Sequence, residues 1–203
     1  MPINLDEVAD SVSKHVTLGK EEWYISQWKK SETNFTKDNI LEELERLSVD
    51  RIKNPTTAVQ PINEDLVDNI ITTVGLNHTG DLQIGVVSTT LDWNSLGTGT
   101  GAEVLGDTDL GTELTGSPYV RKQFSVVGTR VRTNQTITFA MLWDDTDVPT
   151  SPGVPYAVAE SGVHFAVSGS SNIYARAVFT VFNLDAGDIL VIRATVLHQN
   201  GTL

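Results

Sequence analysis

The chain has 203 residues, of which 39% are hydrophobic, and this is enough to bury a sizeable core. Its 14 basic and 26 acidic residues give a formal net charge of -12, which repels phosphate backbones and anionic membranes, so neither nucleic acid nor a membrane is expected as a partner. The cysteine count of zero excludes disulfides, thiolate catalysis and zinc sites built on cysteine.

Residues 1–60 are predicted to form a helical docking region. Asn4 is a suitable N-cap for a first helix and Gly19 can end it, and a second helix is predicted over residues 37–47. Each helix has a narrow apolar stripe, formed by Leu5, Val8, Val12 and Val16 in the first and by Ile40, Leu41, Leu44 and Leu47 in the second. Neither helix can persist alone in water, so each must pack on the rest of the chain or on a partner.

Large apolar side chains are concentrated between these two helices. Trp23, Tyr24, Ile25 and Trp28 fall within six positions. They indicate either a local core beneath the helices or an anchoring surface, because Trp and Tyr are enriched at interface hot spots. The candidate interface residues under the second interpretation are Trp23, Tyr24, Trp28, Leu41 and Leu44.

Residues 54–61 (NPTTAVQP) contain two prolines and no charge, which predicts a linker and a domain boundary. Residues 62–203 are then predicted to form an antiparallel β-sandwich of jelly-roll or immunoglobulin-like type. The clearest strand is 136–143, where Ile, Phe, Met and Trp alternate with Thr and Ala. Further strands are expected at 83–88, 124–131, 163–167, 173–182 and 189–197.

The stretch 96–121 is rich in glycine and carboxylates but does not match a nucleotide-binding loop. No lysine occurs between Lys53 and Lys122, and the spacing of Gly97, Gly99 and Gly101 does not fit a dinucleotide fingerprint. We therefore expect a surface connection, with its glycines at positive φ and its leucines and valines packed on the core.

No other residue pattern indicates catalysis, a cofactor or a metal. The four histidines, His15, His78, His164 and His198, lack the spacing of metal ligands, and Glu160 and His164 would lie about 13 Å apart on one face of a strand. Two acidic groups, Asp144, Asp145 and Asp147 and then Asp107, Asp109 and Glu113, lack the spacing of a calcium loop, although the second could hold a cation if the loop folds back. The sequence predicts no catalytic residue, no cofactor and no metal site.

Several segments in a fixed order resemble a family of tailed-phage virion structural proteins. They are 70–77 (IITTVGLN), 96–100 (LGTGT), 106–114 (GDTDLGTEL), Arg121, 160–165 (ESGVHF), 174–179 (YARAVF) and 185–195 (DAGDILVIRAT). Members of that family are β-rich, non-enzymatic components of tails, baseplates or fibres, and sometimes of heads. The resemblance implies that Glu113 and Arg121 pair with polar groups elsewhere in the fold, and that Glu160 and Arg176 form a structural pair.

The resemblance also implies a location in the virion, other virion proteins as partners, and a homo-oligomer such as a ring or trimer. Three alternatives stay open. The chain can be a head decoration or vertex protein, a hydrolase acting on cell envelopes, or a module that binds a carbohydrate or host receptor. The last would use an aromatic platform drawn from Trp93, Tyr119, Trp143 and Tyr156.

Overall fold

The computed structural model describes residues 21–83, 85–115, 120–133, 136–144, 146–147 and 155–197. The helix predicted between Asn4 and Gly19 lies outside these residues and stays a prediction. The fold is mainly β, with 45% strand and 18% helix, which confirms the predicted class. The elements are, in chain order, β1 (Glu21–Lys29), a 3-10 turn (Lys30–Glu32), α2 (Ile40–Lys53), β2 (Asn63–Ile71), α3 (Thr73–Gln83), β3 (Trp93–Gly97), β4 (Lys122–Gln123), α4 (Phe124–Val127), β5 (Gly128–Thr133), β6 (Thr136–Asp144), β7 (Tyr156–His164), β8 (Ile173–Leu184) and β9 (Asp188–Leu197).

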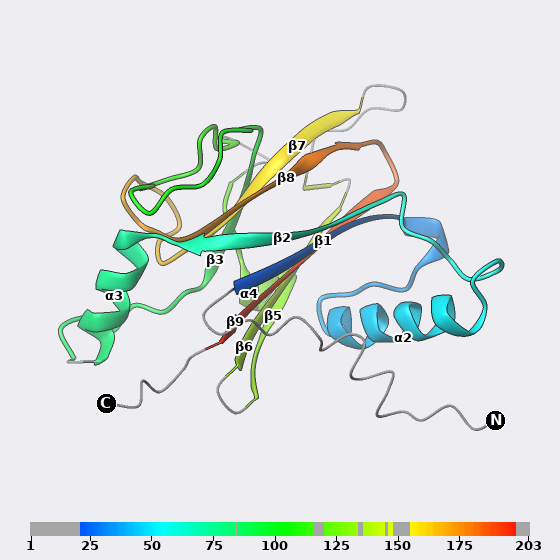
Figure 1. Ribbon diagram of the computed structural model, residues 1–203, viewed down its shortest axis with the longest axis horizontal. Helices are drawn as coiled ribbons and strands as arrows, with labels where there is room; N and C mark the ends of the chain where they lie inside the picture. The colour runs from blue at the N-terminus through cyan, green and yellow to red at the C-terminus, as the bar shows by residue number, and fades with distance from the viewer. Residues whose placement is uncertain are drawn as a thin grey trace.

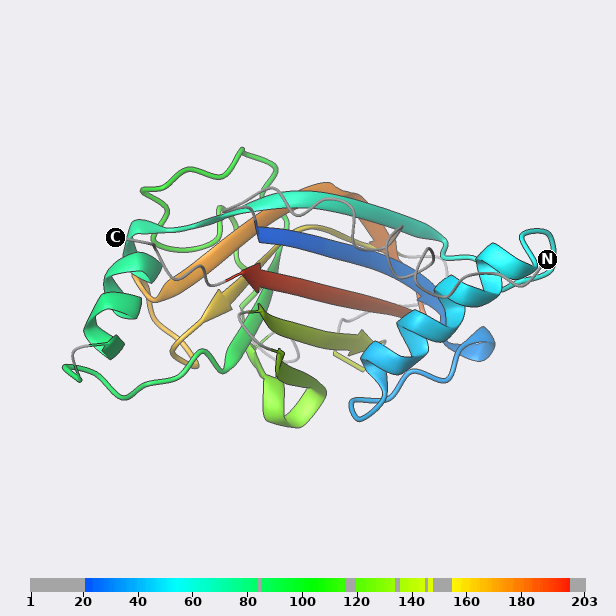
Figure 2. The same cartoon turned by 60° about the horizontal axis from the view of Figure 1, so that its bottom comes forward.

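The described strands form one antiparallel sheet in the order β4-β3-β7-β8-β2-β1-β9-β6-β5. In Figure 2, β2, β1, β9, β6 and β5 lie side by side, and β7 and β8 pass behind them. β2 joins the two halves, because it pairs with β1 along most of its length and with β8 only at Ile70 and Ile71. The sheet is therefore nearly closed into a barrel, instead of being divided into the two separate sheets of the predicted sandwich.

The Trp- and Tyr-rich segment between the predicted helices is the strand β1, which lies in the middle of the sheet between β2 and β9 (Figure 1). Trp23 and Ile25 alternate onto the inner face and are fully buried there. Residues 21–53 thus share one fold with the remaining strands. The segment 54–61 connects α2 to β2 within that fold, so the domain boundary predicted there does not separate a helical region from the sheet.

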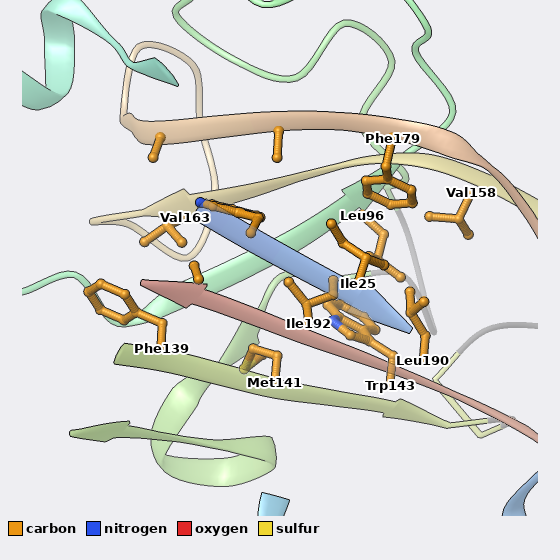
Figure 3. Close-up of a cluster of buried hydrophobic side chains, with 14 of the residues drawn as sticks. Ile25, Leu96, Phe139, Met141, Trp143, Val158, Val163, Phe179, Leu190 and Ile192 are labelled. Carbon is orange, nitrogen blue, oxygen red and sulfur yellow. The ribbon is translucent and has the colours of Figure 1, made fainter. Parts of the chain in front are cut away.

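The main core fills the space between the two halves of the sheet. Figure 3 shows side chains from opposite halves converging, with Leu96, Val158 and Phe179 on one side and Met141, Trp143 and Leu190 on the other. All six are at most 5% exposed. Dense packing of this kind is what holds a sheet in a curved, nearly closed shape.

The helix α2 covers a second, smaller core on the outer face of the sheet. It begins at Ile40 and ends at Lys53, so the prediction of 37–47 found the helix but not its ends. Its buried residues Leu44 and Leu47 pack with Trp28 of β1 and Val191 of β9. Glu43 is 5% exposed and accepts hydrogen bonds from the Asn34 backbone amide and the Arg46 guanidinium.

The candidate interface residues therefore lie mostly in the interior. Trp23 is 0%, Trp28 1% and Leu44 4% exposed. Tyr24 and Leu41 are half-buried, and Tyr24 lies under the guanidinium of Arg193. Trp28 and Leu44 lie in the core beneath α2, with Tyr24 and Leu41 packed against it, whereas Trp23 belongs to the main core. The anchoring surface was therefore the wrong alternative for the three buried residues.

Strand predictions succeeded where alternation was long and failed near glycine and at short runs. The predicted strands 136–143, 173–182 and 189–197 match β6, β8 and β9. The strand predicted at 83–88 is absent from its described residues, since α3 ends at Gln83 and residues 85–88 form no strand, and 124–131 is divided between α4 and β5. The strand predicted at 163–167 is the end of β7, which already stops at His164.

We predict that Leu44→Ala lowers the free energy of unfolding by about 2–5 kcal/mol, because it leaves a cavity in the core beneath α2. The matched control is Leu66→Ala, since Leu66 is 56% exposed and its truncation should change stability by at most about 0.5 kcal/mol. Urea denaturation of both variants measures the difference. Unchanged stability together with weaker self-association of the Leu44 variant would restore the interface interpretation.

Candidate functional site

The glycine-rich connection is fastened to the sheet by one buried carboxylate. Glu160 of β7 is 0% exposed. Its Oε1 accepts hydrogen bonds from the amides of Gly99 (2.9 Å) and Thr112 (2.7 Å), and its Oε2 accepts one from the amide of Gly111 (2.9 Å). Backbone amides far apart along the loop thus converge on one side chain, which holds both ends of the loop in place.

Arg176 of β8 supplies the charge that this buried carboxylate needs. Its Nε and Nη2 lie 2.9 Å and 2.8 Å from Glu160 Oε2, so the pair predicted from the family resemblance is formed. Arg176 also donates to Asp107 Oδ2 and to the Gly101 carbonyl, both at 2.9 Å. Burial disfavours the charged guanidinium, but the hydrogen bonds to Asp107 and Glu160 outweigh it and raise the pKa of Arg176.

Three of the loop glycines, Gly97, Gly99 and Gly111, are required by close approach and not by backbone angle. The described glycines with positive φ are Gly85, Gly169 and Gly187, so the positive φ expected in the loop was wrong for the loop glycines that the structure describes. Instead, a Cβ on Gly99 would lie 2.5 Å from Glu160 Oε1, and one on Gly111 would lie 2.9 Å from Arg176 Nη2. A Cβ on Gly97 would also collide with the Glu160 side chain. Only glycine leaves room for the carboxylate to reach these amides.

A second arginine, Arg121, forms a parallel arrangement at the end of the loop. Its Nε and Nη2 donate to the two oxygens of Glu113 at 2.6 Å and 2.7 Å, so these two predicted residues pair with each other. Nη2 also reaches Asp109 (3.2 Å) and the Gly169 carbonyl (3.1 Å), and Nη1 reaches the Ala166 carbonyl (3.2 Å) and Asn172 Oδ1. All five N–H groups of the guanidinium therefore face an acceptor.

A buried chain of hydrogen bonds leads from this arginine into the core. Asn172 Nδ2 donates to the carbonyls of Ser168 and Gly169, so its Oδ1 is the acceptor facing His164 Nδ1 at 3.1 Å. Burial, aided by the charge of Arg121 and opposed by the Asn172 hydrogen bond, lowers the pKa of His164 to about 3. The neutral ring is then protonated at Nδ1, and Ser95 Oγ donates to Nε2 at 2.6 Å.

This Ser95–His164–Asn172 chain has the distances of a nucleophile, a base and an orienting group. Ser95 and His164 are both 0% exposed, so no substrate reaches the hydroxyl while the described fold stays closed. The same residues connect β3, β7 and the turn that follows β7. The arrangement therefore acts as a link between elements, and it escaped sequence analysis because Ser95 and Asn172 come from segments that are far apart along the chain.

The remaining predicted sites are not assembled. Among the residues that the structure describes, no three His, Cys, Asp or Glu side chains are grouped to hold a metal ion. Trp143, a proposed member of the aromatic platform, is 1% exposed and donates to Asn94 Oδ1, whereas Trp93 and Tyr156 are half-buried and Tyr119 lies outside the described residues. None of the helices in the described part of the chain is both long and apolar enough to span a membrane.

In comparisons with known proteins, no family model, no curated protein and no solved structure matches the chain. The resemblance to virion proteins therefore stays a prediction from the sequence.

We predict that Gly99→Ala lowers the free energy of unfolding by about 1–3 kcal/mol, because the added methyl displaces the Glu160 carboxylate from the loop amides. Gly101→Ala is the matched control, since a Cβ at Gly101 meets nothing within 4 Å. Chemical denaturation of the two variants compares the sites. Equal effects of both substitutions would contradict the close-approach explanation of the glycines.

We also predict a loss of stability on acidification that depends on His164. An unfolded chain protonates this histidine near pH 6.5, whereas the folded protein does so only at about pH 3. The unfolded state therefore binds more protons in this window, and stability falls as the pH is lowered through it, by about 2 kcal/mol between pH 7 and pH 5.

Urea denaturation at the two pH values measures the loss, and His164→Gln should remove about this amount of the pH dependence. Titration of the His164 ring between pH 5 and pH 7 in NMR spectra of the folded protein would contradict the prediction.

Proposed function

We propose that the chain is a non-enzymatic structural protein of a tailed virus particle, most consistent with a tail, baseplate or fibre component. In this proposal it assembles with other virion proteins and with further copies of itself, and the helix predicted over residues 4–19 belongs to the assembly region. The family resemblance of residues 70–203 supports the assignment. The structural observation that carries it is the way the glycine-rich loop presents its tip.

The tip of the loop is a rigid turn with apolar side chains directed to solvent. Val104 and Asp107 close the turn with two hydrogen bonds of 3.0 Å. Arg176 holds Asp107, the Val178 amide donates to Glu103 Oε1 (2.7 Å), and the Thr73 amide donates to the Leu105 carbonyl (2.7 Å). Nevertheless Val104 is 56% and Leu105 55% exposed. The polar groups fix the backbone, and the groups left for a partner are apolar.

The neighbouring helix α3 adds to this surface. It begins at Thr73, whose amide contacts the turn, and Leu76, one helical turn further on, is 53% exposed. A preorganised apolar surface loses little conformational entropy when it becomes buried against another subunit. This is the character of an assembly contact.

The buried polar groups also favour assembly over catalysis. Glu160 and Ser95 have no exposed surface, and each is already satisfied by neighbours in the described fold. Groups arranged in this way stabilise a loop and leave no reactive atom at the surface.

Two other functions are alternatives to this proposal. A head decoration or vertex protein would use the same kind of apolar contact, and separate labelling of heads and tails distinguishes it. A carbohydrate- or receptor-binding role has less support, because burial of Trp143 removes it from any stacking platform.

We predict that the double variant Val104→Ser, Leu105→Ser reduces incorporation into particles at least about tenfold, because each serine removes apolar area from the contact. The matched control is Val86→Ser, Val126→Ser, since these valines are 66% and 59% exposed elsewhere on the surface. Quantitative immunolabelling of particles of the encoding virus measures incorporation. Absence of the wild-type protein from particles, together with a monomer at high concentration in sedimentation, would reject the proposed function.

A further inference from the structure

A pocket of about 310 Å³ opens beside Arg121. Asp109 and Glu113 contribute its polar wall, and Leu114, Val120 and Val167 contribute its apolar wall. Val120 and Val167 are 51% and 52% exposed, whereas Leu114 is 9% exposed and belongs to the main core. The pocket thus combines an apolar entrance with charged groups that are mostly buried.

The charges in the pocket select against an anion. All five N–H groups of Arg121 are occupied by acceptors of the protein, and its side chain is only 4% exposed. Two carboxylates and one guanidinium leave a net charge of -1, with 27% of the Asp109 side chain and 16% of the Glu113 side chain accessible. A ligand that enters the pocket meets carboxylate oxygens and not a free cation.

The environment of Asp109 also favours a cationic ligand over an anionic one. Burial and the neighbouring charge of Glu113 raise its pKa, and the hydrogen bond from the Ser171 amide and the charge of Arg121 do not fully offset them. A positive charge added to the pocket would offset its net negative charge. Because Glu113 already accepts the Arg121 fork with both oxygens, a compact ammonium with three donors fits the remaining lone pairs better than a second planar guanidinium does.

We propose that this pocket binds the side chain of a lysine from a neighbouring polypeptide, with the ammonium at Asp109 and Glu113 and the methylenes against Val120 and Val167. The identification of that polypeptide as another particle protein rests on the proposed function. The net charge of -12 makes a basic protein a more favourable source of this lysine than a second copy of this chain, whose contacts with itself would lie elsewhere.

The test uses n-butylammonium as the analogue of the lysine side chain, titrated into the ¹⁵N-labelled full chain and followed by NMR. We expect saturable shifts at the amides of Thr115, Val120 and Gly169, which line the pocket. Neutral n-butanol should bind at least fivefold more weakly, and n-butyrate should not shift these signals. Affinity should increase about two- to fourfold per methylene from methylammonium to butylammonium, as expected for an apolar wall.

Asp109→Asn keeps the shape of the side chain and should weaken n-butylammonium binding about tenfold. Asp38→Asn changes the net charge equally at an exposed position and should leave binding unchanged. Val167→Thr keeps the side-chain shape and should reduce the gain in affinity per methylene of the alkylammonium series. This variant therefore tests the apolar wall separately from the carboxylates. Equal binding of n-butanol or n-butyrate, or no loss in the Asp109 variant, would overturn the proposal.

The two proposals can fail separately. Binding of n-butylammonium by a protein that is absent from particles would reject the virion assignment and keep the lysine pocket. Incorporation into particles without any ammonium binding would reject the lysine pocket and keep the virion assignment.

Discussion

The structure around the glycine-rich loop depends on one interaction, the buried contact of Glu160 with Arg176 and three loop amides. A carboxylate with no exposed surface is stable only when its charge is paired and its lone pairs are filled. The loop supplies the amides and β8 supplies the guanidinium. A Cβ at Gly97 or Gly99 would collide with this carboxylate, and one at Gly111 would collide with the Arg176 guanidinium, which explains these three glycines.

The second arginine, Arg121, is likewise held by a buried ionic contact, at the other end of the loop. Arg121 binds Glu113 and Asn172, and through Asn172 it orients His164 and Ser95 in the core. The loop is therefore attached to the nearly closed sheet at both ends by buried ionic groups, whereas its tip and the pocket beside it remain open. Both proposed contacts, the apolar tip and the lysine pocket, depend on this rigidity, because a mobile loop would lose much of its binding energy in becoming ordered.

Much of the fold could be predicted where local pattern and tertiary environment agree. β6 alternates along its length and was found from that alternation, and α2 was found from its apolar stripe. β1 was missed because both of its faces are buried, Trp23 against the main core and Trp28 beneath α2, so its sequence does not alternate between polar and apolar residues. α3 was missed because two Gly and two Thr among its 11 residues weaken the helical pattern, and it packs at Gly75 directly on the Tyr174 backbone.

The mainly β class, the acidic charge and the residue types that a buried ionic network needs could all be predicted from the amino-acid sequence. It also indicated the partners Glu160 and Arg176 and the residues Glu113 and Arg121, through their place in the family resemblance. Three features became evident only in the folded protein. The Trp-rich segment is a central strand, Gly97 and Gly99 make room for a carboxylate, and Ser95 and Asn172 meet at His164. These features depend on which distant segments become neighbours, and no periodicity along a single chain records that.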